Sequence, residues 1–107
     1  MWKVETMNSI RFADPGDLRL STGRQDGAKR SKYLQQVQQF GAEITDMPPI
    51  EVTAGRDGEL MINDGVTRAT RCHYLSPGEL VPVDVIDVRT FADFSRLLRV
   101  RDVPPPR

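Results

Sequence analysis

The sequence predicts one small α+β domain, made of an antiparallel hairpin and two to three short helices. Two stretches that are expected to be strands, residues 50–53 and 59–62, flank Arg56-Asp57-Gly58, which has the composition of a hairpin turn. Apolar residues recur at three- and four-residue steps before and after this hairpin, as in amphipathic helices. The 107 residues are enough for one domain with a modest core.

The composition is that of a soluble globular protein, with 38% hydrophobic and 28% charged residues. The net charge is zero, so binding to nucleic acid or an acidic membrane would need a local basic cluster. The chain shows no membrane-spanning run and no signal peptide. One cysteine and one histidine exclude an internal disulfide and the usual Cys- or His-based metal sites. We therefore expect a cytoplasmic protein without membrane contact, the alternative being a secreted or injected fragment of a larger protein.

The first part of the chain is expected to form short strands, a turn and a helix. Arg11 lies between two apolar residues, as in a short strand, and residues 14–17 (Asp-Pro-Gly-Asp) have turn composition. The alternation in Leu18-Arg19-Leu20 fits a short edge strand. Residues 28–40 show helical spacing of apolar residues, and Gly41 is a natural C-terminal stop.

The middle and last parts are expected to add three strands and two helices. Residues 50–53 and 59–62 should pair as the hairpin, and a helix should run from the Asp64-Gly65 turn to about Leu75. The β-branched residues 81–88 predict another strand. The apolar stripe of residues 91–98 predicts a short helix. We expect a domain over residues 1–103 and a Pro-rich extended tail over 104–107.

The turn into the second helix has the outline of an anion-binding site. Gly65 allows the backbone to approach a ligand, and the free N–H groups of the helix start face the same space as the Arg68 guanidinium. A guanidinium is a planar group of donors suited to phosphate. Arg71 follows Arg68 on the same predicted helix and offers a second one. The alternative is ordinary helix chemistry, in which Asp64 caps the helix and pairs with Arg68 one turn later.

A locally basic segment precedes the first helix. It contains four cations, namely Arg24, Lys29, Arg30 and Lys32. The segment either contributes to a binding surface or is simply a solvated helix face.

Six motifs follow one another along the chain: Gly23-Arg24-Gln25, the Tyr33–Gly41 helix, Pro49-Ile50-Glu51-Val52, Asp57-Gly58-Glu59, Asn63-Asp64-Gly65-Val66-Thr67-Arg68 and Val81-Pro82-Val83. Their order and spacing resemble the ParB/sulfiredoxin-like superfamily over roughly Arg19 to Val88. The resemblance implies a small single-domain fold with a mixed sheet, in which the antiparallel hairpin is packed by two to three helices.

Members of this superfamily that bind or cleave nucleotides hold phosphates at the glycine–arginine helix start. The resemblance therefore implies phosphate contacts from Arg24, Gly65, Val66, Thr67 and Arg68, with Arg71 as a further candidate. Sulfiredoxins carry a reactive cysteine where this chain has Val66, so their chemistry is not expected. The superfamily's kinases have a histidine pair in place of Val66-Thr67, and partition proteins have Glu-Arg-Arg after the glycine.

These observations predict a phosphate-directed ParB-like domain, either a nuclease or a nucleotide-phosphate enzyme, with a bacterial toxin domain as one setting. In that function Arg68 would neutralise phosphate charge, and Asp64 is the preferred catalytic base, ahead of Asp26 and Glu43. Mg²⁺ is the cofactor that such a reaction would use. The alternative is a non-catalytic nucleotide- or protein-binding module on the same fold.

Four other residues have simpler interpretations. Cys72 is expected to be a packed core thiol, and His73 lies too far along its helix to reach the anion site. Trp2 and Tyr74 either stack on a base or are packing residues.

Overall fold

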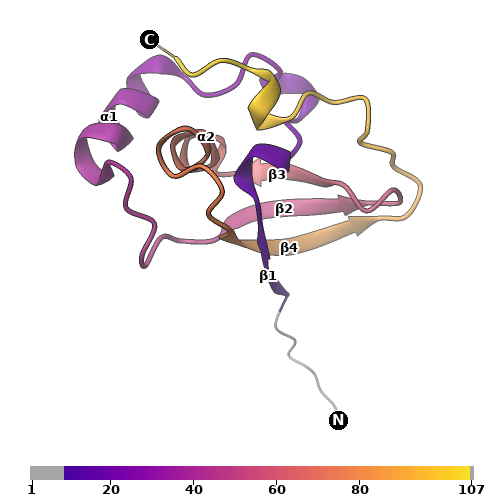
Figure 1. Cartoon of the computed structure of the whole chain (residues 1–107). Helices are drawn as coiled ribbons and strands as arrows, with labels where there is room; N and C mark the ends of the chain where they lie inside the picture. The colour runs from indigo at the N-terminus through magenta and orange to yellow at the C-terminus, as the bar shows by residue number, and fades with distance from the viewer. Residues whose placement is uncertain (1–8, 107) are drawn as a thin grey trace.

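A four-stranded mixed sheet and two α-helices form the framework of the chain (Figure 1). The computed structural model describes residues 9–106. The strands are β1 (Ile10–Ala13), β2 (Ile50–Gly55), β3 (Leu60–Asp64) and β4 (Val81–Arg89), and the α-helices are α1 (Arg30–Phe40) and α2 (Val66–Leu75). Three short 3-10 helices complete the described chain: η1 (Pro15–Asp17), η2 (Thr22–Arg24) and η3 (Val100–Asp102).

The strand order in the sheet is β1-β4-β2-β3. β2 and β3 form the predicted antiparallel hairpin, and β1 pairs with β4 in antiparallel fashion. β2 and β4 are parallel, so the chain must cross over between them, and α2 lies in that crossover. The predicted α+β class with a mixed sheet is therefore confirmed.

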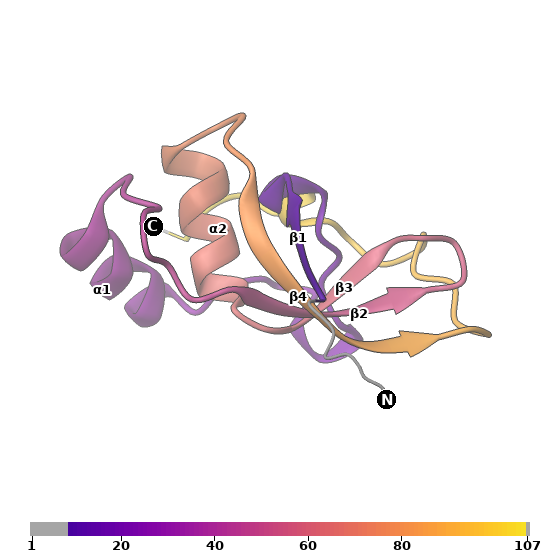
Figure 2. The ribbon, with the colours of Figure 1, turned by 90° about the horizontal axis from the view of Figure 1, so that it is seen from below.

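The hydrophobic core lies between α2 and the sheet. Its buried members come from both sheet and helix, together with residues from the N- and C-terminal parts of the described chain: Leu18, Leu20, Ile50, Val52, Ile62, Val66, Ala69, Cys72, Val81, Val83 and Val100. Figure 2 shows α1 beside α2 at one end of the molecule and the β2–β3 hairpin reaching toward the other. Cys72 is buried in this core, as predicted from its position in the helix.

The segment Leu18–Leu20 connects β3 to the C-terminal part of the chain. The amide of Arg19 donates to the Leu60 carbonyl over 2.8 Å, and its carbonyl accepts from the amide of Ile62. On the other side, Leu20 donates to Leu98 and the Leu18 carbonyl accepts from Val100. The predicted edge strand is thus a short bridging segment with partners on both sides.

The helix predicted over residues 91–98 does not form, and that prediction was wrong. The amide of Phe94 donates to the Asp57 carboxylate over 2.9 Å, and the Arg19 guanidinium donates to the carbonyls of Ser95 and Leu97. These backbone groups are therefore bound by distant residues instead of by each other. Phe91, which the helical stripe would have buried, is 95% exposed.

The chain after η3 stays in contact with the domain through Val103. Its side chain packs against the core, and its carbonyl accepts a hydrogen bond from the Tyr74 hydroxyl. Trp2 and Arg107 lie outside the described residues. Among residues 9–106, the helices are too short or too polar to cross a lipid bilayer.

Candidate phosphate-binding cleft

A cleft of about 180 Å³ opens at the start of α2. Three elements line it: Arg24 comes from η2, Lys32 and Gln36 come from α1, and Asp64 to Arg68 come from the β3–α2 turn and the first turn of α2. The lining carries three cations and one carboxylate. The cleft is thus locally cationic in a chain whose net charge is zero.

Gly65 is required at the turn by its conformation and by its surroundings. It is the N-cap residue of α2, with a positive φ of 114° that favours glycine. A Cβ atom at this position would lie 2.9 Å from Nη2 of Arg68 and 3.2 Å from the Ile50 side chain. The glycine therefore leaves room for the Arg68 guanidinium directly over the helix start.

Asp64 does not cap α2, so the predicted capping role was wrong. It is the last residue of β3, where it pairs with Glu51, and α2 has no side-chain cap. Its carboxylate Oδ2 instead lies 3.7 Å from Nη2 of Arg68, which is the helical i, i+4 pair that the sequence suggested. The Asp64 side chain is 72% exposed, so solvent screens this ion pair strongly.

Arg68 lies at the inner wall of the cleft with only part of its donor capacity used. Its side chain is 20% exposed, and Nη2 donates to the Pro49 carbonyl over 3.2 Å. Its Nε atom is buried and has no acceptor among the described residues. Buried donors are nearly always satisfied in folded proteins, so this unpartnered Nε is an exception that a bound acceptor would remove.

The structure gathers most of the predicted site residues in this cleft. Arg24 and the segment Gly65–Arg68 all line it. Sequence analysis named Lys32 in the basic segment, for which a binding surface and a solvated helix face were both left open, and it did not name Gln36. Their i, i+4 spacing places both on one side of α1, and that was the available signal.

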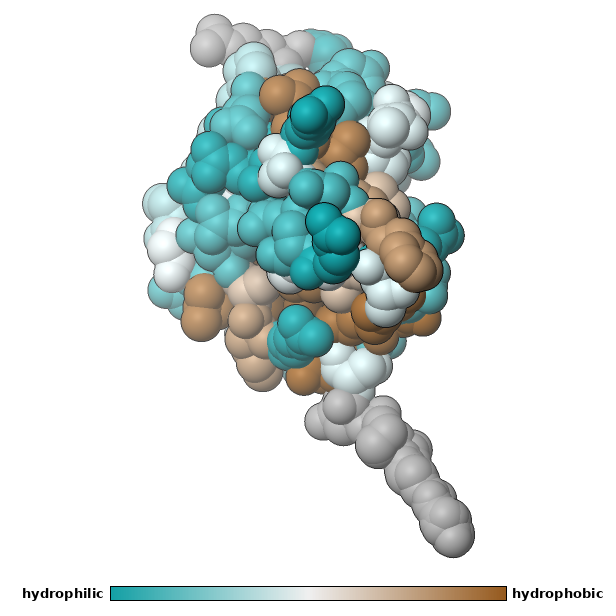
Figure 3. All heavy atoms as spheres, turned by 90° about the vertical axis from the view of Figure 1, so that its right-hand side faces the viewer, coloured by the Kyte–Doolittle hydropathy of each residue, from teal (hydrophilic) through white to brown (hydrophobic). Residues whose placement is uncertain are grey.

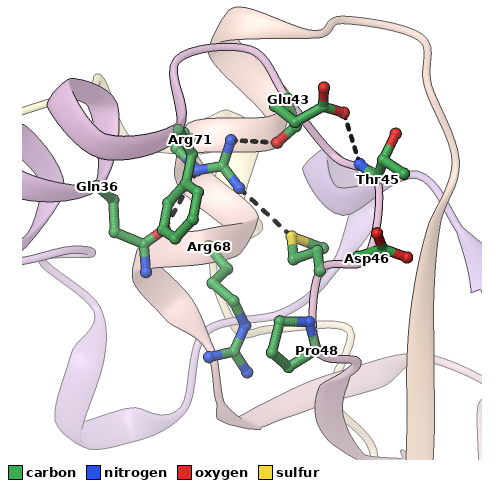
Figure 4. A pocket seen from close by; sticks show the side chains of 9 residues that line it. Gln36, Glu43, Thr45, Asp46, Pro48, Arg68 and Arg71 are labelled. Carbon is green, nitrogen blue, oxygen red and sulfur yellow. Dashed lines mark hydrogen bonds between the residues drawn. The ribbon is translucent and has the colours of Figure 1, made fainter.

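Arg71 lies elsewhere, in a neighbouring small cavity of about 70 Å³ (Figure 4). It is 2% exposed, and its guanidinium donates to the carbonyls of Gly41 and Glu43 and to Oε1 of Gln36. It also lies over the Phe40 ring, 5.3 Å from the centroid. The guanidinium is thus occupied by the loop after α1 and does not line the phosphate cleft.

The second cavity adds no catalytic base. Glu43 accepts a hydrogen bond from the amide of Thr45 over 2.8 Å, and its interaction with Thr45 lowers the pKa of its carboxyl group. Figure 4 shows its side chain turned toward Thr45, away from Arg68. Among residues 9–106, Asp64 is the only carboxylate that lines the phosphate cleft.

Cys72 and His73 are both remote from the cleft lining. Burial raises the pKa of the Cys72 thiol, and its sulfur lies 3.4 Å from the Met47 sulfur. His73 packs edge-on against Tyr74, with ring centroids 4.5 Å apart. Neither side chain is placed to act on a group bound at Gly65.

The described residues 9–106 contain no cluster of three or more His, Cys, Asp or Glu side chains suited to a metal ion. A single carboxylate such as Asp64 can be enough for Mg²⁺ beside a phosphate. Proteins often bind this ion through one or two carboxylates, and the phosphate oxygens supply further ligands. The relation to ParB/sulfiredoxin-like proteins stays a prediction from the order of motifs. Comparisons of the chain with models of protein families, with curated proteins and with solved structures found no match.

Proposed function

We propose that this chain is a phosphate-directed domain whose ligand is a nucleotide or a nucleic-acid phosphate. The observation that carries the proposal is that Arg24, Lys32 and Arg68 line one cleft together with the first turn of α2. A helix N-terminus offers free N–H groups and partial positive charge, and arginine offers a planar fork. Together these groups complement a phosphate.

Arg68 has the central role in this proposal. Its guanidinium is held over Gly65 by the Pro49 carbonyl, so it is oriented before any ligand binds. A phosphate in the cleft would give its unsatisfied donors an acceptor and would compete with Asp64 for Nη2. Arg24 and Lys32, from η2 and α1, would neutralise the outer oxygens.

The catalytic form of the proposal is phosphoester hydrolysis, as in a ParB-like nuclease. Water attacks phosphorus and gives its proton to the Asp64 carboxylate, while the bond from phosphorus to the leaving oxygen breaks and that oxygen takes a proton from solvent. The three cations stabilise the charge that builds on the non-bridging oxygens. If Mg²⁺ binds, Asp64 would be its protein ligand instead of the base, and the ion would supply further charge neutralisation at the phosphate oxygens.

One observation favours the non-catalytic alternative. The cleft contains a single carboxylate and neither a histidine nor a second acid, which is a sparse set for acid–base chemistry. The second candidate is therefore a module that binds a nucleotide phosphate without cleaving it.

The experiment compares wild type, Arg68→Ala and Lys29→Ala in nucleotide binding by calorimetry and in plasmid cleavage with Mg²⁺. Lys29 is an exposed cation of the same basic segment that does not line the cleft, so its variant is the matched control. Loss of a hydrogen-bonded charge costs about 1.5–3 kcal/mol, so Arg68→Ala should weaken binding roughly 10- to 100-fold. Cleavage that is lost in Arg68→Ala and kept in Lys29→Ala supports the enzyme, and binding without cleavage supports the module. If wild type binds neither nucleotide nor DNA, the proposal is refuted.

A further inference from the structure

The two ends of the molecule differ in character. The hairpin end, which faces the viewer in Figure 3, shows apolar side chains beside polar ones over the lower half of that view. The other end, where α1 lies beside α2 (Figure 2), holds the phosphate cleft and the small cavity. Gln36 and Arg68 line both of these spaces, so they form the boundary between them. A side chain at such a boundary can present one atom to the cavity and another to the cleft.

The side-chain oxygen of Gln36 is bound by Arg71. Its Oε1 accepts a hydrogen bond from Nε of Arg71 over 3.2 Å. A guanidinium has donors and no acceptor, so only the oxygen of the amide can face it. Arg71 is held in place, because it is 2% exposed and its Nη1 donates to the carbonyls of Gly41 and Glu43. A buried arginine therefore fixes the orientation of the Gln36 amide.

The NH2 group of Gln36 is left for the phosphate cleft. The oxygen and the nitrogen of an amide point in different directions, so an oxygen bound to Arg71 turns the nitrogen away from it. Figure 4 shows this nitrogen pointing away from Arg71, on the side where the Arg68 guanidinium lies. Within residues 9–106, the bond to Arg71 is the only side-chain hydrogen bond of Gln36, and its nitrogen is not buried. Its two N–H donors are thus available to a ligand.

We infer that Gln36 is a phosphate-binding residue, whose NH2 group donates to an oxygen of the phosphate bound in the cleft. This inference rests on the proposed function of the cleft. The three cations that line the cleft, Arg24, Lys32 and Arg68, attract anions of any shape. A neutral amide adds direction without charge, because its N–H group must point at an oxygen to bind it. Gln36 therefore contributes to the recognition of the phosphate group, and Arg71 aims its amide from outside the cleft.

Glutamate at this position separates the structural contact of Gln36 from the inferred one. One carboxylate oxygen of Gln36→Glu would still accept from Arg71, and that bond would be stronger because both partners are charged. The other oxygen would take the place of the NH2 group and would repel a phosphate. The variant should therefore be as stable as wild type and should bind phosphate more weakly. A purely structural Gln36 would leave binding unchanged.

Heteronuclear NMR of the full chain follows Gln36 directly, because glutamine NH2 groups give their own signals. The probes are inorganic phosphate and ATP, each added at an ionic strength held constant with NaCl. In wild type, the Gln36 NH2 signals should shift with the same Kd as the Gly65 amide. Gln36→Glu should weaken binding of both probes at least about tenfold, as for the loss of a hydrogen bond to a charged group, without lowering the free energy of unfolding in urea.

Gln35→Glu is the matched control. It makes the same charge change at an exposed neighbouring position of α1 that lines neither the cleft nor the small cavity. Because salt screens an exposed charge, Gln35→Glu should change either Kd by less than about twofold.

The outcomes distinguish the inference from the proposed function. If the Gly65 amide shifts and the Gln36 NH2 signals do not, the inference is overturned and the proposed function stands. A folded Gln36→Glu variant that binds both probes like wild type has the same meaning. Weaker binding by Gln36→Glu without a shift of the wild-type NH2 signals reflects repulsion alone and also overturns the inference. If neither probe shifts the Gly65 amide, the inference and the proposed function fail together.

Discussion

Replacing Arg71 tests whether this arginine stabilises the fold or binds a ligand. In the structure its guanidinium donates to Gln36 and to the carbonyls of Gly41 and Glu43, at distances of 3.2, 2.9 and 2.7 Å. Arg71→Met keeps the length of the side chain but removes every donor. The loop after α1 would then lose its attachment to α2.

The size of the effect follows from these contacts. Each hydrogen bond contributes about 1 kcal/mol net, below the usual value for a charged donor because the three acceptors lie in partly exposed surroundings. Three bonds therefore give a loss of about 3 kcal/mol in the free energy of unfolding. For a domain of this size, such a loss lowers Tm by roughly 12–24 °C.

Urea denaturation followed by circular dichroism measures this loss, with Arg96→Ala as the control. Arg96 is an exposed arginine of the loop after β4, and its removal should change the free energy of unfolding by less than about 0.5 kcal/mol. The reasoning is refuted if Arg71→Met has wild-type stability. It is refuted with equal force if the variant is stable and binds nucleotide more than tenfold more weakly, because Arg71 would then be a ligand residue, as the sequence first suggested.

Three further outcomes follow from the structure. Gly65→Ala should destabilise the chain by more than about 1 kcal/mol and weaken phosphate binding, because both its φ of 114° and the nearby Arg68 oppose a Cβ atom. Gly58→Ala, which has a positive φ but open space around it, should show a smaller destabilisation in the same urea titration and no binding defect. The Cys72 thiol should react slowly with a thiol reagent at pH 8 and rapidly in denaturant, because burial raises its pKa; fast labelling of the native protein would show an open core. Hydrogen bonds from Ser95 lower the pKa of Asp93 from 3.8 to about 2, so its contribution to stability is present above pH 3.8 and is lost as the pH falls toward 2. Asp93→Asn should flatten that part of the acid-unfolding curve, and a curve identical to wild type would contradict this assignment.

Local signals in the sequence were sufficient for the elements whose ends are marked by glycine or proline. α1 ends at Phe40 because Gly41 follows, and the hairpin turns at Arg56-Asp57-Gly58 as predicted. Helical spacing was not sufficient over residues 91–98. Asp57 and Arg19 bind the backbone of that segment from 37 and up to 78 positions away, and periodicity contains no information on such contacts.

The candidate site, too, was predictable only where local sequence determines it. The turn at Gly65 and the position of Arg68 follow from local sequence, and the structure places them together. The different locations of Arg68 and Arg71 do not follow from local sequence. They are three residues apart on one helix, but only the loop after α1 provides carbonyl acceptors for Arg71. That loop is placed by tertiary packing alone.

The bridging segment Leu18–Leu20 has a consequence for biosynthesis. Its partners Leu98 and Val100 lie far along the chain from it and are synthesised much later. A nascent chain that is still attached to the ribosome with these residues inside the exit tunnel cannot complete its core. Domains with such non-local contacts fold slowly, so the core of this one should form only after Val100 has left the exit tunnel.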